Sequence, residues 1–317
     1  MSNIQSFINY IGDPRARRSI RSIYNSIKED IAAVSYYPNP SGAQDYFVDL
    51  NVSASGNGKS WGKAFGTIAE AITASNTSIG LAGNRWWARR NRIFVQGDVI
   101  TESLTVLPEK CDIIGVGTDL RAFPRVYGQH TISLAKVGCR FINMGFVSNA
   151  AGVMMTIPLS SHGFSLIDCQ FEAASAGITK GLMITSCAHT RFIGNKFTVG
   201  AGSMTNILGL AMSLEGTVLH DTYIEDNHIT ATLGISVVES GAAAMGSLIK
   251  GNTLRTTGIA IDDNSDDFQV VDNRWMTDVD TTTSTAGYDF SLQLAAGNIQ
   301  MGVTGLCDMV PFTKIAE

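Results

Sequence analysis

Six short stretches of the chain share one pattern of apolar and polar positions. Each opens and closes on a large apolar residue, and the third of its six positions is always Asn, Asp or Gly. The stretches are Phe141–Phe146, Leu166–Phe171, Phe192–Phe197, Ile224–Ile229, Ile249–Leu254 and Val270–Trp275. Successive stretches begin 25, 26, 32, 25 and 21 residues apart. A repeat of this length predicts a solenoid, in which each coil buries its apolar face against its neighbours.

The third and fourth positions of the repeat predict a bend and a ladder of amides. Third-position residues are of the types that adopt a left-handed backbone at the lowest cost, so we expect each strand to bend there. They are Asn143, Asp168, Gly194, Asp226, Gly251 and Asp272. The fourth position is Asn in four stretches, at Asn195, Asn227, Asn252 and Asn273. We predict that these amides stack inside a buried turn, with Asn227 against Asn252 in adjacent coils.

A set of ordinary hairpins with Asn and Gly turns is the alternative interpretation. Two observations disfavour it. The Asn-Gly dipeptide of a tight antiparallel hairpin is absent between the apolar flanks. The spacing between stretches is also too long for a meander, so parallel coils are the expectation.

The residues ahead of the first repeat predict an entry segment. A strand is expected at Tyr46–Leu50, followed by a glycine-rich loop and a short helix over 65–74 with Ile68, Ala71 and Ile72 on one face. Further strands are expected at Ile93–Gln96 and Cys111–Gly117, which makes about eight coils. The helix is expected to cap the open end of the stack, where unpaired strand edges would otherwise be exposed.

This entry segment resembles that of right-handed parallel β-helix proteins of the pectate-lyase-like superfamily. The matching pieces are Tyr46–Asp49, Gly56–Trp61 and Phe65–Ile72, and with the coils the resemblance covers roughly residues 45–280. It implies an all-β fold, a right-handed single-stranded parallel β-helix with a short capping helix. Many members cut polysaccharides, but the motifs of the lyases and of the related hydrolases are absent.

Residues 1–40 differ from the rest and are expected to form a helical anchoring arm. Asp13-Pro14 is a favourable helix start. A heptad seam follows at Ile20, Tyr24, Ile27, Ile31 and Val34. Isoleucine at both core positions favours three strands, so we expect a homotrimer; a helix packed on its own domain is the alternative. The residues expected to dock the arm on a partner are Ile4, Phe7, Ile8, Ile11, Arg15, Arg17 and Arg18.

The linker Pro38–Gly42 separates this arm from the β-helix, which is expected to span residues 41–285. Residues 286–317, with apolar alternation at Phe290, Leu292 and Leu294, are expected to cap the other end or to exchange between subunits. Between the first strands, the loop 84–92 holds Trp86 and Trp87 among four arginines. Trp and Arg are enriched at binding hot spots, so this loop is a second candidate partner site; a tryptophan buried under the cap is the alternative.

Composition excludes some classes of function. Only 16% of residues are charged and the formal net charge is −5, so neither nucleic acid nor a membrane is an expected partner. The N-terminus lacks the apolar stretch of a signal peptide. The five cysteines, Cys111, Cys139, Cys169, Cys187 and Cys307, form no C-x-x-C pair and are interpreted as buried core thiols.

The acidic residues predict no active site. A glycosidase needs two carboxylates at a defined separation, and those within the coils are Asp168, Glu225, Asp226 and Asp272. Three of them hold the bend position, where backbone geometry explains them. The run Asp262–Asp267 lacks the glycine and closing glutamate of an EF-hand, and the histidines show no metal spacing. We expect no cofactor and no metal; catalysis stays undecided, with the balance against it.

Arm, linker and short β-helix together look like a bacteriophage virion protein. The leading hypothesis is a homotrimeric capsid decoration protein, a cement or spike protein, assembled in the host cytoplasm and bound to a capsid or tail protein. The alternatives are a tailspike-type polysaccharide depolymerase and a non-catalytic carbohydrate-binding module, for which a host surface glycan would be the ligand.

Overall fold

The computed structural model describes residues 43–83, 88–117, 123–199, 206–239, 246–263, 268–277 and 299–301. Contacts divide the chain after Ala43 into two compact units, and all but the first of these residues belong to the second unit, Gln44–Glu317. The predicted arm 1–40 lies outside the described residues. So does the predicted C-terminal segment 286–317, apart from three residues.

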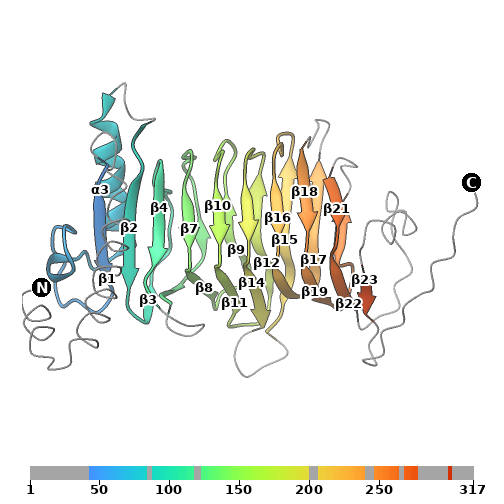
Figure 1. Ribbon diagram of the computed structural model, residues 1–317. Coiled ribbons are helices and arrows are strands. Elements are labelled where there is room, and N and C mark those ends of the chain that lie inside the picture. Colours follow the sequence, from blue (N-terminus) through green and yellow to red (C-terminus); the bar gives the residue numbers. More distant parts are fainter. Residues whose placement is uncertain are drawn as a thin grey trace, which may run out of the picture. The chain divides into compact units, whose positions relative to one another are not determined.

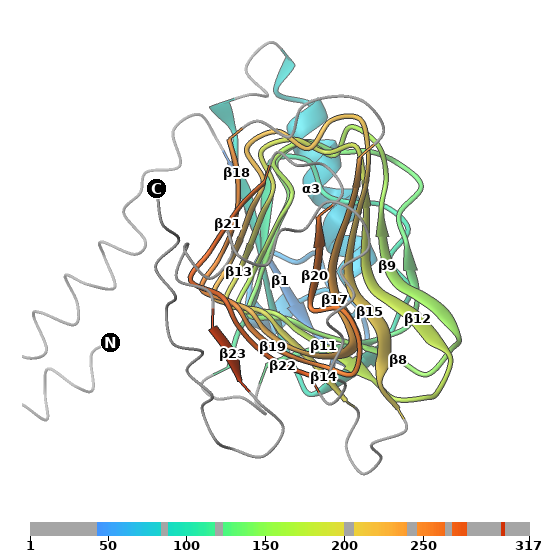
Figure 2. The ribbon, with the colours of Figure 1, turned by 90° about the vertical axis from the view of Figure 1, so that its right-hand side faces the viewer.

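The described residues form an all-β solenoid of parallel strands, which confirms the predicted fold class (Figure 1). Its strands stack on three faces, visible when the coils are seen end-on (Figure 2). The first face is a nine-stranded sheet to which each coil contributes one strand. In order they are β1 (Asp45–Asp49), β2 (Asn91–Gln96), β4 (Cys111–Gly115), β7 (Arg140–Ile142), β10 (Ser165–Ile167), β13 (Arg191–Ile193), β16 (Tyr223–Glu225), β18 (Ser247–Lys250) and β21 (Phe268–Val271). The entry strand and the eight predicted coils account for this sheet.

The second and third faces belong to one continuous sheet that turns a corner. On the second face lie β3 (Val99–Thr101), β5 (Arg125–Tyr127), β8 (Gly145–Ser148), β11 (Gln170–Ala173), β14 (Lys196–Val199), β19 (Thr253–Thr256), β22 (Arg274–Thr277) and β23 (Ile299–Met301). On the third face lie β6 (His130–Thr131), β9 (Gly152–Ile157), β12 (Ile178–Thr185), β15 (Leu208–Gly216) and β20 (Ile261–Asp263). The long strand β17 (His228–Glu239) joins both, because it pairs with β14 at its start and with β15 from Ala231 onward.

Between the first and second faces, each coil bends at the predicted position. All six third-position residues have a positive φ, from 52° at Asp168 to 68° at Gly194, which confirms the bend. At five of the six bends, from Asn143 to Gly251, the backbone N–H donates to a carbonyl of the next coil, as from Asp168 to Ile193 at 2.9 Å. The left-handed conformation therefore pairs these five amides and aligns the turn from coil to coil.

Directly after the bend, four asparagines form the predicted ladder. The Nδ2 of Asn227 donates to the Oδ1 of Asn252 at 2.9 Å, and the same contact joins Asn195 to Asn227 and Asn252 to Asn273. Each amide oxygen also accepts a backbone N–H of the preceding coil, from the preceding asparagine in three cases and from Cys169 in the case of Asn195. Each Nδ2 also donates to a carbonyl of the preceding coil, as from Asn252 to Ile224 at 2.9 Å. All four side chains are buried. The prediction that Asn227 and Asn252 stack in adjacent coils is confirmed.

The core inside the coils consists of aliphatic side chains together with stacked aromatic rings and buried thiols. Phe146, Phe171 and Phe197 lie one above another in successive coils, with ring centroids 5.2 and 4.8 Å apart. The thiols of Cys111 and Cys139 are buried on the first face in neighbouring coils, as expected. Cys169 and Cys187 are buried as well, whereas Cys307 lies outside the described residues.

One end of the stack is covered by α3 (Ile68–Gly80), which contacts β1 and β2. The expected helix 65–74 was placed too early and too short. Thr67 and Glu70 form a capping box that fixes the start at Ile68, and both oxygens of Glu102, from the turn after β3, accept the first helical N–H groups. The predicted buried face of Ile68, Ala71 and Ile72 is confirmed and continues to Ile79. A short 3-10 helix, η1 (Trp61–Lys63), precedes it.

We predict that Asn252→Leu lowers the free energy of unfolding, because the leucine leaves the amides of Asn227 and Asn273 without their partner. The expected loss is about 1 to 3 kcal/mol for each buried polar group stranded. Urea unfolding followed by circular dichroism measures it. Asn51→Leu, at an exposed position, is the matched control and should change stability little. Equal stability of the two variants would contradict the ladder.

Candidate functional site

The outer side of the first sheet carries an unbroken row of apolar side chains, which we call the apolar column. Its members occupy equivalent positions in six consecutive strands. They are Phe47, Phe94, Ile114, Ile142, Ile167 and Ile193, and each is paired in register with the next. All six are partly exposed. The next residues in the same row, Glu225 and Lys250, are charged, so the column ends after β13.

Strand alternation explains why these side chains face outward. Phe141 is fully buried, and Ile142 follows it in β7, so the two side chains point to opposite sides of the sheet. The same holds for Leu166 with Ile167. Sequence reasoning missed the column, although its signal lay in the second position of the repeat, which is isoleucine in the first three stretches.

At its entry end, the apolar column is extended by aromatic rings. Phe47 stacks on Phe94 with centroids 5.6 Å apart, and the ring of Trp61 meets Phe47 edge-on at 4.9 Å. Trp61 is 36% exposed. The guanidinium of Arg92 lies over the ring of Phe94. A partly exposed aromatic cluster therefore closes this end of the column.

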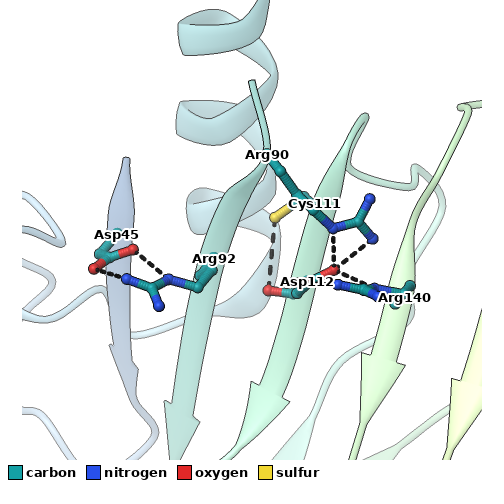
Figure 3. A network of polar contacts seen from close by, with 6 residues as sticks. All are labelled: Asp45, Arg90, Arg92, Cys111, Asp112 and Arg140. Atoms are coloured by element: carbon teal, nitrogen blue, oxygen red, sulfur yellow. Dashed lines mark hydrogen bonds and ion pairs between the residues drawn. The ribbon is translucent and has the colours of Figure 1, made fainter. Parts of the chain in front are cut away.

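A row of charged side chains runs beside the apolar column, and its members are paired within the chain (Figure 3). Arg92 donates two hydrogen bonds of 2.8 Å to the carboxylate of Asp45. Asp112 accepts from Arg90 at 2.8 Å and from Arg140 at 2.7 Å. Burial alone would raise the pKa of Asp112, but the hydrogen bonds from Arg140 and Arg90 outweigh it and hold that pKa below its ordinary value. Asp112 therefore stays ionised and binds two arginines across three coils.

The arginine-rich loop is only partly described. Arg89 donates to the carbonyl of Ser78 at 2.9 Å, and Arg90 is held by Asp112. Trp86 and Trp87 lie outside the described residues. The same is true of every other predicted partner-binding residue, Ile4, Phe7, Ile8, Ile11, Arg15, Arg17 and Arg18, and of the seam residues Ile20, Tyr24, Ile27, Ile31 and Val34. These predictions remain predictions.

The third face holds a polar cluster that combines a serine, a lysine and a carboxylate. Lys180 contacts both Glu215 and the Oγ of Ser213, the latter at 3.2 Å, and Ser213 donates to Glu215 at 2.7 Å. The hydrogen bond from Lys180 lowers the pKa of Glu215. These contacts join Lys180 of β12 to Ser213 and Glu215 of β15, so the cluster ties the two strands together.

The aspartates at the bends between the first and second faces also occupy positions that the backbone conformation explains. Asp168, Asp226 and Asp272 all lie at bends with positive φ. Glycine separates them along the row, and a Cβ on Gly251 would lie 2.4 Å from the Oδ1 of Asp226. The carboxylate therefore folds over the glycine of the next coil. Alternation of Asp and Gly also keeps like charges two coils apart, which limits their repulsion.

Among the other titratable groups of the described residues, Lys136 pairs with Glu109 and His189 lies beside Asp221, and several thiols and one imidazole are buried. Within these ranges, no group of three or more His, Cys, Asp or Glu side chains is placed to hold a metal ion. Burial raises the pKa of the Cys111 and Cys169 thiols to about 12, so they carry no thiolate near neutral pH. His130 is buried against the ring of Phe146, and burial lowers its pKa to about 4.

No protein-family model matches the chain, and comparisons with curated proteins and with solved structures find no match either. Across the described ranges, no helix has both the length and the apolar character needed to cross a membrane. Function is therefore inferred from the surfaces of the β-helix and from the sequence.

We predict that Gly251→Ala destabilises the β-helix by about 1 to 2 kcal/mol from the left-handed backbone alone, with a further cost from the clash with Asp226. In the background of Asp226→Gly the clash is absent, so the same substitution should cost less. Chemical denaturation of wild type, the two single variants and the double variant measures this coupling between positions 226 and 251. Gly62→Ala is the control, because that position is open and has no positive φ. Equal costs in both backgrounds would contradict the carboxylate placement.

Stability should fall as the pH is lowered from about 6.5 to about 4, in part because of His130. Its pKa is about 4 in the folded protein against 6.5 when unperturbed, so the unfolded chain binds more protons in this window. The contribution of His130 to the free energy of unfolding is therefore complete above pH 6.5 and is lost as the pH falls, by roughly 3 kcal/mol at pH 4. Denaturation of His130→Gln across this range should show a shallower slope than wild type. The same slope in both would refute the assignment; His228→Gln, at an exposed position, controls for loss of an imidazole.

Proposed function

We propose that this protein is a non-enzymatic structural protein of a bacteriophage virion. In this proposal it belongs with the pectate-lyase-like β-helix proteins and decorates the capsid as a homotrimeric cement or spike protein. Residues 1–40 anchor it to a capsid or tail protein, and the β-helix projects as a shaft. It is made in the host cytoplasm and assembled there into the virion.

The observation that carries the proposal is how the shaft uses its acidic residues. Asp168, Asp226 and Asp272 stand at left-handed bends, Asp112 is bound by two arginines, and Glu215 is bound by Lys180. A polysaccharide-cleaving site needs a pair of carboxylates free to act as acid and as base or nucleophile. Each of these groups has a structural partner or a backbone reason for its position, which supports a structural protein.

The regularity of the coils supports a projecting shaft. Its bends are aligned along six coils, a stack of phenylalanine rings joins three of the coils, and the amide ladder joins four of them. Such repeat proteins are elongated and stable in proportion to their number of coils. We propose that Ile4, Phe7, Ile8, Ile11 and Arg15, Arg17, Arg18 dock the arm, and that Trp86 and Trp87 add a second contact.

A second candidate is a glycan-binding relative of the tailspikes. The observation that favours it is the partly exposed ring of Trp61 beside Phe47 and Phe94, because aromatic rings with polar neighbours are common in binding sites. A protein with this role binds a host surface glycan without cutting it, or cuts it with carboxylates from two subunits.

We predict that removal of residues 1–37 abolishes attachment to the virion and leaves the β-helix folded. The linker Pro38–Gly42 separates the arm from the shaft in sequence, so few contacts should cross it. Binding of the full-length and truncated proteins to particles that lack the protein, followed by sedimentation of the particles, measures attachment. Circular dichroism checks the fold of the truncated chain. Attachment that survives the truncation would contradict anchoring by the arm.

Incubation with host capsule or lipopolysaccharide should release no oligosaccharide. Release of defined products, lost on Asp226→Asn or Asp272→Asn without loss of stability, would replace this proposal with a depolymerase. Binding of the glycan without release, weakened by Trp61→Ala, would favour the binding module. Truncation and incubation together distinguish the three functions.

A further inference from the structure

We infer that the apolar column is the seam along which three copies of the chain pack, in parallel and with same-numbered coils at the same height. This inference rests on the proposed homotrimer and adds the surface that forms it. All six side chains of the column come from strands of the shaft.

The spacing of the column identifies its partner. Its side chains come from successive coils in register, so they repeat at the strand separation of roughly 4.8 Å, and six of them span roughly 24 Å. An extended peptide repeats its same-side residues at about 6.8 Å and a helix turns every 5.4 Å, so neither stays in step over that length. A second copy of the shaft has the same spacing at every coil.

The row changes from apolar to charged side chains at β16, and this change favours parallel over antiparallel packing of the copies. In a parallel arrangement Ile167 meets Ile167, and the Glu225 carboxylates of the copies lie one coil from their Lys250 ammonium groups, so the opposite charges offset each other. The row has nine positions and ends at Val271, so antiparallel pairing over its full length would place Lys250 against Phe94 and Glu225 against Ile114. Charges buried on apolar side chains without partners are strongly unfavourable, so the parallel arrangement is favoured.

The column is one side chain wide, which favours three copies around an axis over two flat faces. Of the charges beside it, Asp45 is paired with Arg92 and Asp112 with Arg90 and Arg140, and the guanidinium of Arg191 lies over the ring of Tyr223. A copy that approaches the column between β1 and β7 therefore leaves these carboxylates and arginines paired. The outer side of the second face lacks this character, because it presents Arg125, Gln170, Lys196, His228 and Arg274 in one row.

Thiol cross-linking tests the seam in the full-length protein. The four described thiols are buried, and Cys307→Ser removes the fifth, so a new surface cysteine is the reactive one. Ile167→Cys in this background should be joined between copies by a short bismaleimide, with at most two of every three chains linked. Thr253→Cys, on the outer side of the second face, is the matched control and should stay unlinked at the same protein concentration.

Sedimentation equilibrium gives the second readout. Wild type should have about three times the chain mass of 33.9 kDa, Ile167→Glu should fall to one chain with unchanged circular dichroism, and Thr253→Glu should stay at three. A trimer in which Ile167→Cys is not linked and Ile167→Glu has no effect would overturn the seam and leave the homotrimer standing. A mass of two chains, or of a single chain whose column is covered by residues 302–317, would overturn both the seam and the homotrimer. Attachment to virions is measured separately and is unaffected by this result.

Discussion

Each coil must turn sharply between its first and second faces, and the polar groups of that turn lie inside the protein. A buried amide or carbonyl without a partner costs more than most single contacts contribute, so the turn is possible only if every coil supplies partners to the next. The asparagines meet this requirement: their oxygens accept from the coil before, and their amino groups donate in both directions along the stack. These contacts hold four successive coils in line at the corner between the first and second faces.

Much of the fold could be predicted because this constraint leaves a trace in the sequence. Asn143, Asp226 and Gly251 share a backbone conformation, and only a few residue types adopt it cheaply, so the bend column is legible from residue types alone. Buried thiols at Cys111 and Cys139 followed from their place relative to the same repeat. The strands of the third face were not predicted, because they follow turns of variable length and share no polar signature. The end of α3 was missed because its last turns, through Ile79, pack on strands distant in sequence.

The candidate surface was less predictable than the core. Ile142 and Ile167 look like core residues in sequence, but their neighbours Phe141 and Leu166 point into the core, so alternation along the strand places both isoleucines outside. Pairing between Asp112 and two arginines joins residues 22 and 28 positions away, which no local pattern indicates. A solenoid converts one residue per repeat into a continuous surface, so a weak preference at a single position becomes an apolar column along six coils.

An electron-density map of the first corner, from crystals of the protein, tests the central claim most directly. The account predicts that the amides of Asn195, Asn227, Asn252 and Asn273 lie one above another in four successive coils, each within hydrogen-bonding distance of the next, and that Asp226 and Gly251 have a positive φ. Asparagines 227 and 252 on elements that are not adjacent, or with side chains turned to solvent, would contradict it.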